Sequence, residues 1–204
     1  MYRRNNVVAV AAAFALLAVL VSAGVFHDLD QWAVDHLMPG LEPSPSKTSL
    51  VDSLVPLHGS DWSDGWSIAA NLVALPGSFF IALAILAWRS RVLAIVMLAA
   101  VTVEVVCKEV LTKPALYLDG VHIVPFDSSF PSGHSLRIVL LAGALYPLLR
   151  SWVVGWAFAA IALILLAGWH TPTDIVGGLL LGALGLLCAR SAGALRAGRL
   201  RRAA

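Results

Sequence analysis

The sequence predicts an all-α fold, a bundle of six transmembrane helices with both termini in the cytoplasm. Of its 204 residues, 59% are hydrophobic and 13% are charged, whereas about 25% are charged in an ordinary soluble domain. A helix that crosses about 30 Å of hydrocarbon needs about 20 mostly apolar residues, because its backbone must satisfy its own hydrogen bonds there. We therefore expect one membrane domain over residues 1–204, without a second domain or an internal repeat.

Six apolar segments meet or nearly meet this length, and we place them at 7–26, 66–88, 92–107, 133–149, 152–169 and 174–192. The purely apolar part of the fourth, Ile138 to Leu149, is too short to cross a membrane alone. Its helix must therefore begin at the preceding Pro-Ser-Gly-His. This start puts His134 and Arg137 at the membrane interface.

The first segment has an alternative interpretation as a secretory signal. Arg3 and Arg4 precede its apolar run, which ends in small residues. The run is longer than the usual 7–15 residues of a signal peptide, which favours a retained helix. Cleavage would leave the orientation of the other five segments unchanged.

Basic residues set the orientation, because short cytoplasmic loops are enriched in Lys and Arg. With the N-terminus inside, ten of the 14 Lys and Arg lie on the cytoplasmic side. These are Arg3, Arg4, Arg89, Arg91, Arg150, Arg190, Arg196, Arg199, Arg201 and Arg202. All 12 acidic residues then lie outside or in the outer parts of helices. The basic tail at 193–204 is a topology anchor that can touch anionic lipid, and the charge gives no indication of a nucleic-acid partner.

The longest polar connection, at about 27–65, lies outside the cell in this topology. It contains the half-amphipathic stretch DLDQWAVDHLM and a turn-rich stretch, PGLEPSPSKTS. We expect a short interfacial helix and loop, which either cover a site or form a solvated connector. The inner connections, 89–91 and 150–151, are too short for a cytoplasmic active site.

Small residues and cysteines add two structural expectations. Gly178 and Gly182 in the last segment form a close-packing pattern, which we assign to helix contact within the chain rather than to dimerisation. Cys107 and Cys188 fall at opposite ends of the bilayer, beyond the reach of a disulfide. We expect both to be free thiols in the core.

Three outer helix ends carry polar clusters: CKEVLTKP, PSGHSLR and WHTPTD. A helix that begins near Ser132 directs its unpaired first-turn N–H groups at the outer interface. Gly133 allows another atom to approach that backbone, and His134 and Arg137 share a helix face. The pattern predicts an anion pocket with a titratable group. The structural alternative is a Ser132 helix cap, with His134 and Arg137 reaching the headgroups.

The other two clusters also have two interpretations each. Asp174 either holds the His170 imidazole in one tautomer or completes a capping box over Thr171 to Asp174. Lys108 either binds an anion or pairs with Glu104 one helical turn earlier. Imidazoles, lysines and helix-start amides without a cage of thiolates or carboxylates suit phosphate better than a metal ion. We expect no metal and no cofactor.

At these residues the chain resembles the type 2 phosphatidic acid phosphatase superfamily of integral-membrane lipid phosphatases. That family has Lys, six residues and Arg-Pro; then Pro-Ser-Gly-His; then Ser-Arg, five residues, His, three residues and Asp. The matching residues here are Lys108, then Ser132, Gly133 and His134, then His170 and Asp174. Both family arginines are missing, because Ala115-Leu116 and Leu163-Ile164 stand at Arg-Pro and Ser-Arg.

The resemblance implies hydrolysis of a lipid phosphate or pyrophosphate at the outer leaflet of the plasma membrane, without a metal ion. In the implied mechanism His170 is the nucleophile, Asp174 orients it, and His134 is first the general acid and then the general base. The phosphate would be bound by Lys108, Lys113, Ser132, Gly133 and Arg137.

Each missing arginine removes charge-assisted contacts worth about 1.5–3 kcal/mol. We therefore hypothesise that Arg137, together with Lys113, supplies the lost charge from other backbone positions. The same residues are also compatible with a phosphotransferase. A descendant that binds or transports a lipid phosphate without hydrolysing it is a further alternative.

Overall fold

The computed structural model describes residues 2–41 and 79–203. The chain is mostly helical, which confirms the all-α prediction. The helices are α1 (Tyr2–Ser22), α2 (His27–Leu37), α5 (Phe79–Arg89), α6 (Arg91–Val110), α7 (Gly133–Leu149), α8 (Ser151–Leu166) and α9 (Pro172–Ala203). Two features were not predicted. They are the antiparallel hairpin of β1 (Tyr117–Leu118) and β2 (Val121–His122), and the 3-10 helix η1 (Val124–Ser128).

The helices follow the expected segments closely. α1, α6, α7, α8 and α9 correspond to the first and the last four segments, and α7 has the predicted bounds. α5 covers the end of the second segment, whose residues 66–78 lie outside the described part. α2 is the short helix expected in the connection at about 27–65, and residues 42–65 of that connection are also outside the described part. α9 continues through the basic tail, where Ala, Leu and Arg all favour helix.

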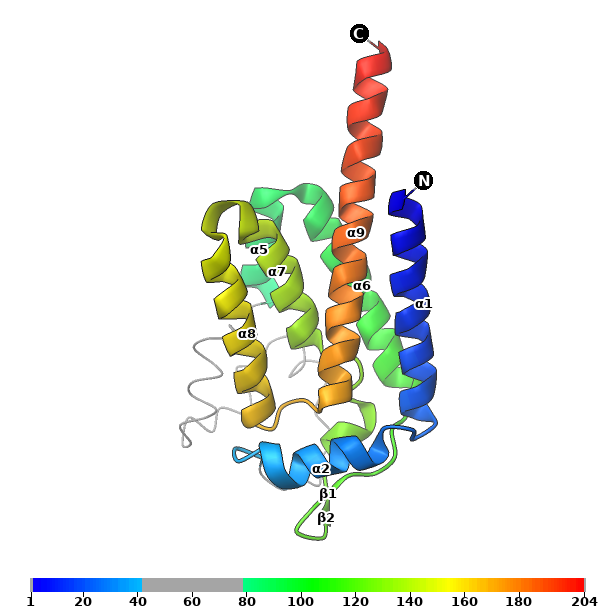
Figure 1. Cartoon of the computed structure of the whole chain (residues 1–204), viewed down its shortest axis with the longest axis vertical. Coiled ribbons are helices and arrows are strands. Elements are labelled where there is room, and N and C mark those ends of the chain that lie inside the picture. Colours follow the sequence, from blue (N-terminus) through cyan, green and yellow to red (C-terminus); the bar gives the residue numbers. More distant parts are fainter. Residues whose placement is uncertain (1, 42–78, 204) are drawn as a thin grey trace.

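By length and composition, two helices in the described part can cross a membrane. They are α1, over Asn5–Ser22, and α9, over Pro172–Ala192. Helices α5, α7 and α8 are apolar but shorter. Together these helices form a bundle in which α9 packs against α1, α6 and α7 (Figure 1).

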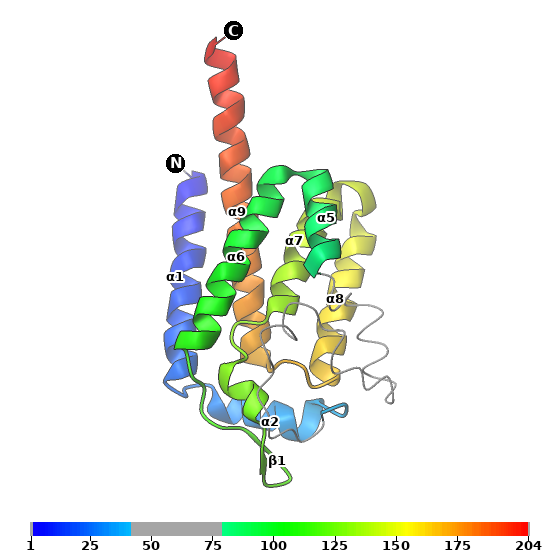
Figure 2. The same ribbon diagram turned by 180° about the vertical axis from the view of Figure 1, so that it is seen from behind.

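The two ends of the bundle differ. Both termini lie at one end, together with the α5–α6 and α7–α8 connections (Figure 1). α2 lies across the opposite end, next to the β1–β2 hairpin, as the reverse view also shows (Figure 2). The first residues of α7 and α9 lie at this α2 end, so the polar clusters of the sequence gather there.

Glycines allow α7 and α9 to approach each other closely. A Cβ on Gly178 would collide with the carbonyl oxygen of Ser132, and a Cβ on Gly182 would lie 2.7 Å from Cβ of Val139. Both contacts are to the α7 region of the same chain. The glycine pair therefore serves packing within the chain, as expected.

Apolar side chains fill the bundle and fix α2 to its end. The main core lies between α5, α6, α7 and α9, and consists of Ala82, Leu86, Ala94, Met97, Ala100, Val101, Leu136, Leu140, Leu141, Ala144 and Leu181. A second cluster joins Ala33, Val34 and Met38 of α2 to Leu116, Ile123 and Phe126. Cys107 and Cys188 are free, but the expectation that both lie in the core is wrong, because Cys107 is half-buried and Cys188 is exposed.

The chain before α7 is held by α1. Phe14 stacks on Phe130, with ring centroids 5.9 Å apart, and Ala18, Val21 and Phe130 form a buried cluster. α1 thus contacts the residue next to the Pro-Ser-Gly-His motif.

Candidate functional site

The two predicted histidines are in direct contact. Nδ1 of His134, on α7, lies 3.1 Å from Nε2 of His170, in the α8–α9 connection. Their ring centroids are 5.3 Å apart, and the indole of Trp169 lies 5.4 Å from the His134 ring. The structure therefore brings together two imidazoles that are 36 residues apart in the sequence.

A tight turn delivers His170 to this position. Gly168 has φ +71°, a left-handed conformation that glycine adopts without steric cost. The N–H of Gly168 donates to Leu165, and that of Trp169 donates to Ile164. This is the Schellman arrangement that ends many helices. The chain leaves α8 abruptly, and His170 follows the turn directly.

Asp174 is fully buried and combines the two roles that the sequence left open. Its Oδ2 accepts hydrogen bonds from Ser129 Oγ at 2.6 Å and from the Thr171 N–H at 3.1 Å. The Thr171 bond is the N3-to-Ncap half of a capping box. The same Oδ2 lies 3.8 Å from Nδ1 of His170. The capping carboxylate is thus also the one beside the histidine.

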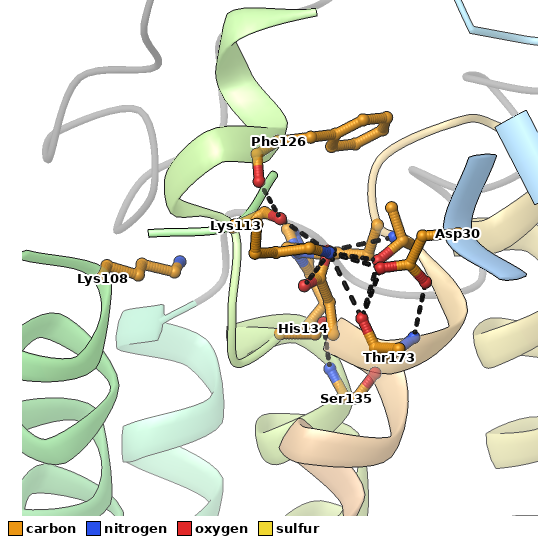
Figure 3. Close-up of polar contacts among 12 residues, drawn as sticks. Asp30, Lys108, Lys113, Phe126, His134, Ser135 and Thr173 are labelled. Atoms are coloured by element: carbon orange, nitrogen blue, oxygen red, sulfur yellow. Dashed lines mark hydrogen bonds and ion pairs between the residues drawn. The ribbon is translucent and has the colours of Figure 1, made fainter. Parts of the chain in front are cut away.

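Lys113 contacts the other carboxylate oxygen of Asp174, Oδ1, in a buried network that includes Asp30 and Thr173 (Figure 3). Its Nζ lies 2.8 Å from Asp30 Oδ2 and 2.9 Å from Asp174 Oδ1. It also donates to Thr171 Oγ1 at 2.7 Å. Although burial disfavours the charged form, Asp174 and Asp30 hold the pKa of Lys113 above its ordinary value. Its donors are engaged, so phosphate binding by Lys113 stays a prediction, and the geometry favours a positioning role.

Asp30 belongs to this network and was missed by the sequence analysis. It lies on α2 with 2% of its surface exposed. Its two oxygens accept from the N–H of Thr173 at 3.2 Å and from its hydroxyl at 2.6 Å. In the sequence, Asp30 is one of three aspartates in an amphipathic stretch. Only the docking of α2 onto α9 distinguishes it, and no local pattern signals that contact.

A second charged cluster lies between α6 and α7. Lys108 donates to Glu104 Oε1 at 2.8 Å, which confirms the pairing one helical turn apart. Glu104 Oε2 lies 3.8 Å from Nη2 of Arg137. A Cβ on Gly133 would collide with the Glu104 carboxylate. Lys108, Arg137 and Gly133 therefore meet around one buried carboxylate, which the sequence analysis had considered only as a partner of Lys108.

Ser132 has the capping role that its structural alternative describes. Its Oγ accepts from the N–H of Ser135 at 3.2 Å, and its own N–H donates to the carbonyl oxygen of Asp174 at 2.9 Å. The latter bond ties the starts of α7 and α9 together. In the first turn of a helix the N–H groups lack acceptors within the helix. Because Ser132 caps the N–H of Ser135, the N–H groups of Gly133 and His134 are the ones that can bind an anion.

The two positions where the family has arginine are Ala115 and Ile164. Ala115 is half-buried, and Ile164 is buried and packs with Ile138 and Ala160. Arg137 precedes Ile138 on α7. A cation thus stands on the helix that packs against Ile164.

His170 is buried, and this sets its protonation. Burial lowers the pKa of His170 below its ordinary value, and Lys108 adds to the shift, although Asp174 opposes it. The neutral imidazole has one protonated and one free nitrogen. The nearby carboxylate favours the proton on Nδ1, so Nε2 carries the lone pair that faces His134.

Comparisons of the chain with protein-family models, with curated proteins and with solved structures found no match.

Proposed function

We propose that the chain is a six-span membrane phosphatase that hydrolyses a lipid phosphate or pyrophosphate through a phosphohistidine. One observation carries the proposal. His170 Nε2 faces His134 Nδ1 at 3.1 Å, while a buried carboxylate lies on the other side of the His170 ring. A nucleophile, a second imidazole and an orienting carboxylate are the parts that covalent catalysis by histidine needs.

The surface of the helices supports a membrane location. Trp88, Trp152 and Phe158 are 74%, 84% and 73% exposed, and a soluble monomer rarely exposes so much apolar surface. The connections that carry Arg89, Arg91 and Arg150 lie at the same end as the termini (Figure 1). The positive-inside rule then assigns this end to the cytoplasm and the histidine pair to the outer face.

In the first chemical step, the lone pair of His170 Nε2 forms a bond to phosphorus while the bond from phosphorus to the lipid oxygen breaks. His134 donates a proton to that oxygen, and the lipid alcohol, or the shorter lipid phosphate, departs. Asp174 orients the His170 ring and stabilises the positive charge that develops on it.

In the second step, His134 removes a proton from water. The water oxygen then forms a bond to phosphorus as the nitrogen–phosphorus bond breaks, which releases inorganic phosphate and restores both histidines. Reacting atoms must approach to about 3–3.5 Å. Because the rings touch each other directly, a phosphoryl group between them requires the imidazoles to separate when substrate binds.

Charge on the phosphoryl oxygens is stabilised from α6 and α7. Lys108 and Arg137 supply the cations, and the first-turn N–H groups of Gly133 and His134 supply backbone donors. Arg137 would thus replace a family arginine from a new backbone position. Lys113 acts indirectly in this scheme, because it holds Asp174.

A second candidate function is lipid-phosphate binding without hydrolysis. The observation that favours it is the pairing of Lys108 with Glu104 at 2.8 Å, which offsets one of the two cations available to phosphate. Transfer of the phosphoryl group to another acceptor uses the same residues, and product analysis with and without acceptor lipid separates it from hydrolysis.

A phosphate-release panel tests the proposal on purified protein. The substrates are phosphatidic acid, phosphatidylglycerophosphate, a polyprenyl pyrophosphate and soluble monophosphates. We expect release from at least one lipid. His170→Ala should lower kcat by about 10³-fold or more because the nucleophile is lost, and Arg137→Ala should lower kcat/KM and weaken inhibition by vanadate. The matched control is His36→Ala, since His36 is an exposed histidine on α2.

Three results would contradict parts of this scheme. Near-normal turnover by His170→Ala would remove the nucleophile assignment. An unchanged Arg137→Ala would refute the relocated cation. Lipid-phosphate binding without phosphate release over a wide pH range would favour the binding function.

A further inference from the structure

We infer that Glu104 is a built-in competitor of the substrate, a carboxylate of the chain itself that occupies the anion position at the start of α7 and sets its affinity for phosphate. The inference deepens the proposed function and rests on phosphate binding at the same site. Glu104 is not part of the residue pattern that the chain shares with lipid phosphatases.

The Glu104 carboxylate is buried against the start of α7. Glu104 is 2% exposed, and its two oxygens and Cδ would all lie within 2.6 Å of a Cβ on Gly133. Only a glycine allows this approach. The carboxylate therefore lies against the first turn of α7, where the helix dipole and the free N–H groups attract negative charge.

Two cations, Lys108 and Arg137, lie next to the Glu104 carboxylate. Lys108 donates to Oε1 at 2.8 Å, and Arg137 Nη2 lies 3.8 Å from Oε2. Among the described residues, Oε2 has no hydrogen-bond donor although it is buried. The two cations that the proposed function assigns to phosphate are thus the two that surround Glu104. A phosphate on Lys108 and Arg137 would meet a like charge in the same small space.

Protein and phosphate therefore compete for one set of donors. A phosphoryl group enters only if the Glu104 carboxylate moves away, and the cost of that movement weakens binding. A free phosphate ion and a phosphate on a lipid bear the same penalty. The lipid is also held by its apolar chains, so a membrane-anchored phosphate can bind where a soluble one is bound only weakly.

Equilibrium dialysis of radiolabelled inorganic phosphate against the purified full chain tests this directly, because it does not depend on turnover. Glu104→Gln keeps the shape of the side chain and removes its charge. We expect it to bind phosphate at least about tenfold more tightly than the native chain, since a like charge at the site is gone. Glu109→Gln is the matched control, because Glu109 is exposed on the same helix, one residue after Lys108.

Equal or weaker phosphate binding by Glu104→Gln would overturn the inference, and would leave Glu104 as a structural partner that holds Lys108 in place. If Glu104→Gln does not fold, Glu104→Asp tests the same point, since its shorter side chain withdraws the carboxylate from Gly133 and should also tighten binding. Unchanged or weaker binding by Glu104→Asp would overturn it too. Tighter binding without any phosphate release would uphold the inference while refuting the phosphatase.

Discussion

At the scale of single residues, two buried clusters divide the work of the site. Asp174 is held by Ser129, Thr171 and Lys113, and in turn lies beside His170. Glu104 holds Lys108 and lies near Arg137. In the proposed function, one carboxylate therefore supports the nucleophile and the other occupies the anion position. Counting all charges near the histidines together would not distinguish these two roles.

The protonation of His170 predicts the pH dependence of turnover. The attacking imidazole must be neutral, and burial lowers its pKa below the ordinary value. In the proposed mechanism, free enzyme with a protonated His170 is inactive. This form therefore accumulates only in more acidic solution. We expect the acid limb of kcat/KM to have its midpoint below about pH 6.5, the ordinary imidazole pKa.

The measurement needs two substrates, because phosphate monoesters themselves titrate near pH 6. An acid limb that is the same for a lipid monophosphate and a lipid pyrophosphate, and whose midpoint differs from the phosphate pKa of each substrate titrated separately, belongs to the enzyme. A shared midpoint at or above pH 6.5 would contradict the assignment.

The sequence was sufficient for some site residues and insufficient for others. His134, Ser132 and Gly133 adjoin one another at a helix start, and His170 and Asp174 are separated by one turn, so local spacing reveals them. Asp30 and Ser129 reach Asp174 only through tertiary folding. The direction of the Lys113 side chain likewise depends on a loop whose path no local rule fixes.

At the scale of elements, α2 is held to the start of α9 by charged groups, while its apolar side chains pack against residues between α6 and α7. Lys113 lies between Asp30 of α2 and Asp174 of α9. Removal of one partner from a buried ion pair leaves unpaired charge and costs about 3–5 kcal/mol. We expect Lys113→Ala to destabilise the protein by about this amount, measured by denaturant unfolding in detergent micelles.

Two further variants are compared with Lys113→Ala in this measurement. Asp30→Asn removes one charge and keeps a hydrogen-bonding side chain, so its effect should be smaller. Arg190→Ala, at an exposed position of α9, should leave stability unchanged. Equal stabilities of Lys113→Ala and Arg190→Ala would show that the network does not hold α2.

Helix positions were predictable because long apolar runs have few alternatives. The residues at which the helices end were less predictable. α9 runs to Ala203 because its tail contains no proline and is rich in Ala, Leu and Arg, which favour helix in spite of Gly193 and Gly198, although its apolar part ends near 192. The β1–β2 hairpin was invisible in the sequence, since each strand has only two residues.

At the scale of the whole molecule, the proposed orientation predicts which end of the bundle faces the medium. Val121, in the hairpin, is 41% exposed, and Ser151, at the opposite end, is also exposed. In a background with Cys107→Ser and Cys188→Ser, a membrane-impermeant maleimide should label Val121→Cys in intact cells. Ser151→Cys should react only after the membrane is opened.

The parent without cysteine controls for background labelling. The reverse pattern, with Ser151→Cys labelled from outside, would place the histidine pair on the cytoplasmic face. Labelling of both positions in intact cells would contradict the membrane topology itself.

α7 and α9 run in the same direction, and this arrangement has an electrostatic consequence. Neighbouring helices that run in opposite directions largely cancel each other's dipoles. Here two adjacent amino ends open on the same spot, joined by the bond from Ser132 to Asp174, so their fields add. In the proposed function, this field attracts a negatively charged headgroup in the bilayer toward the site before any side chain contacts it.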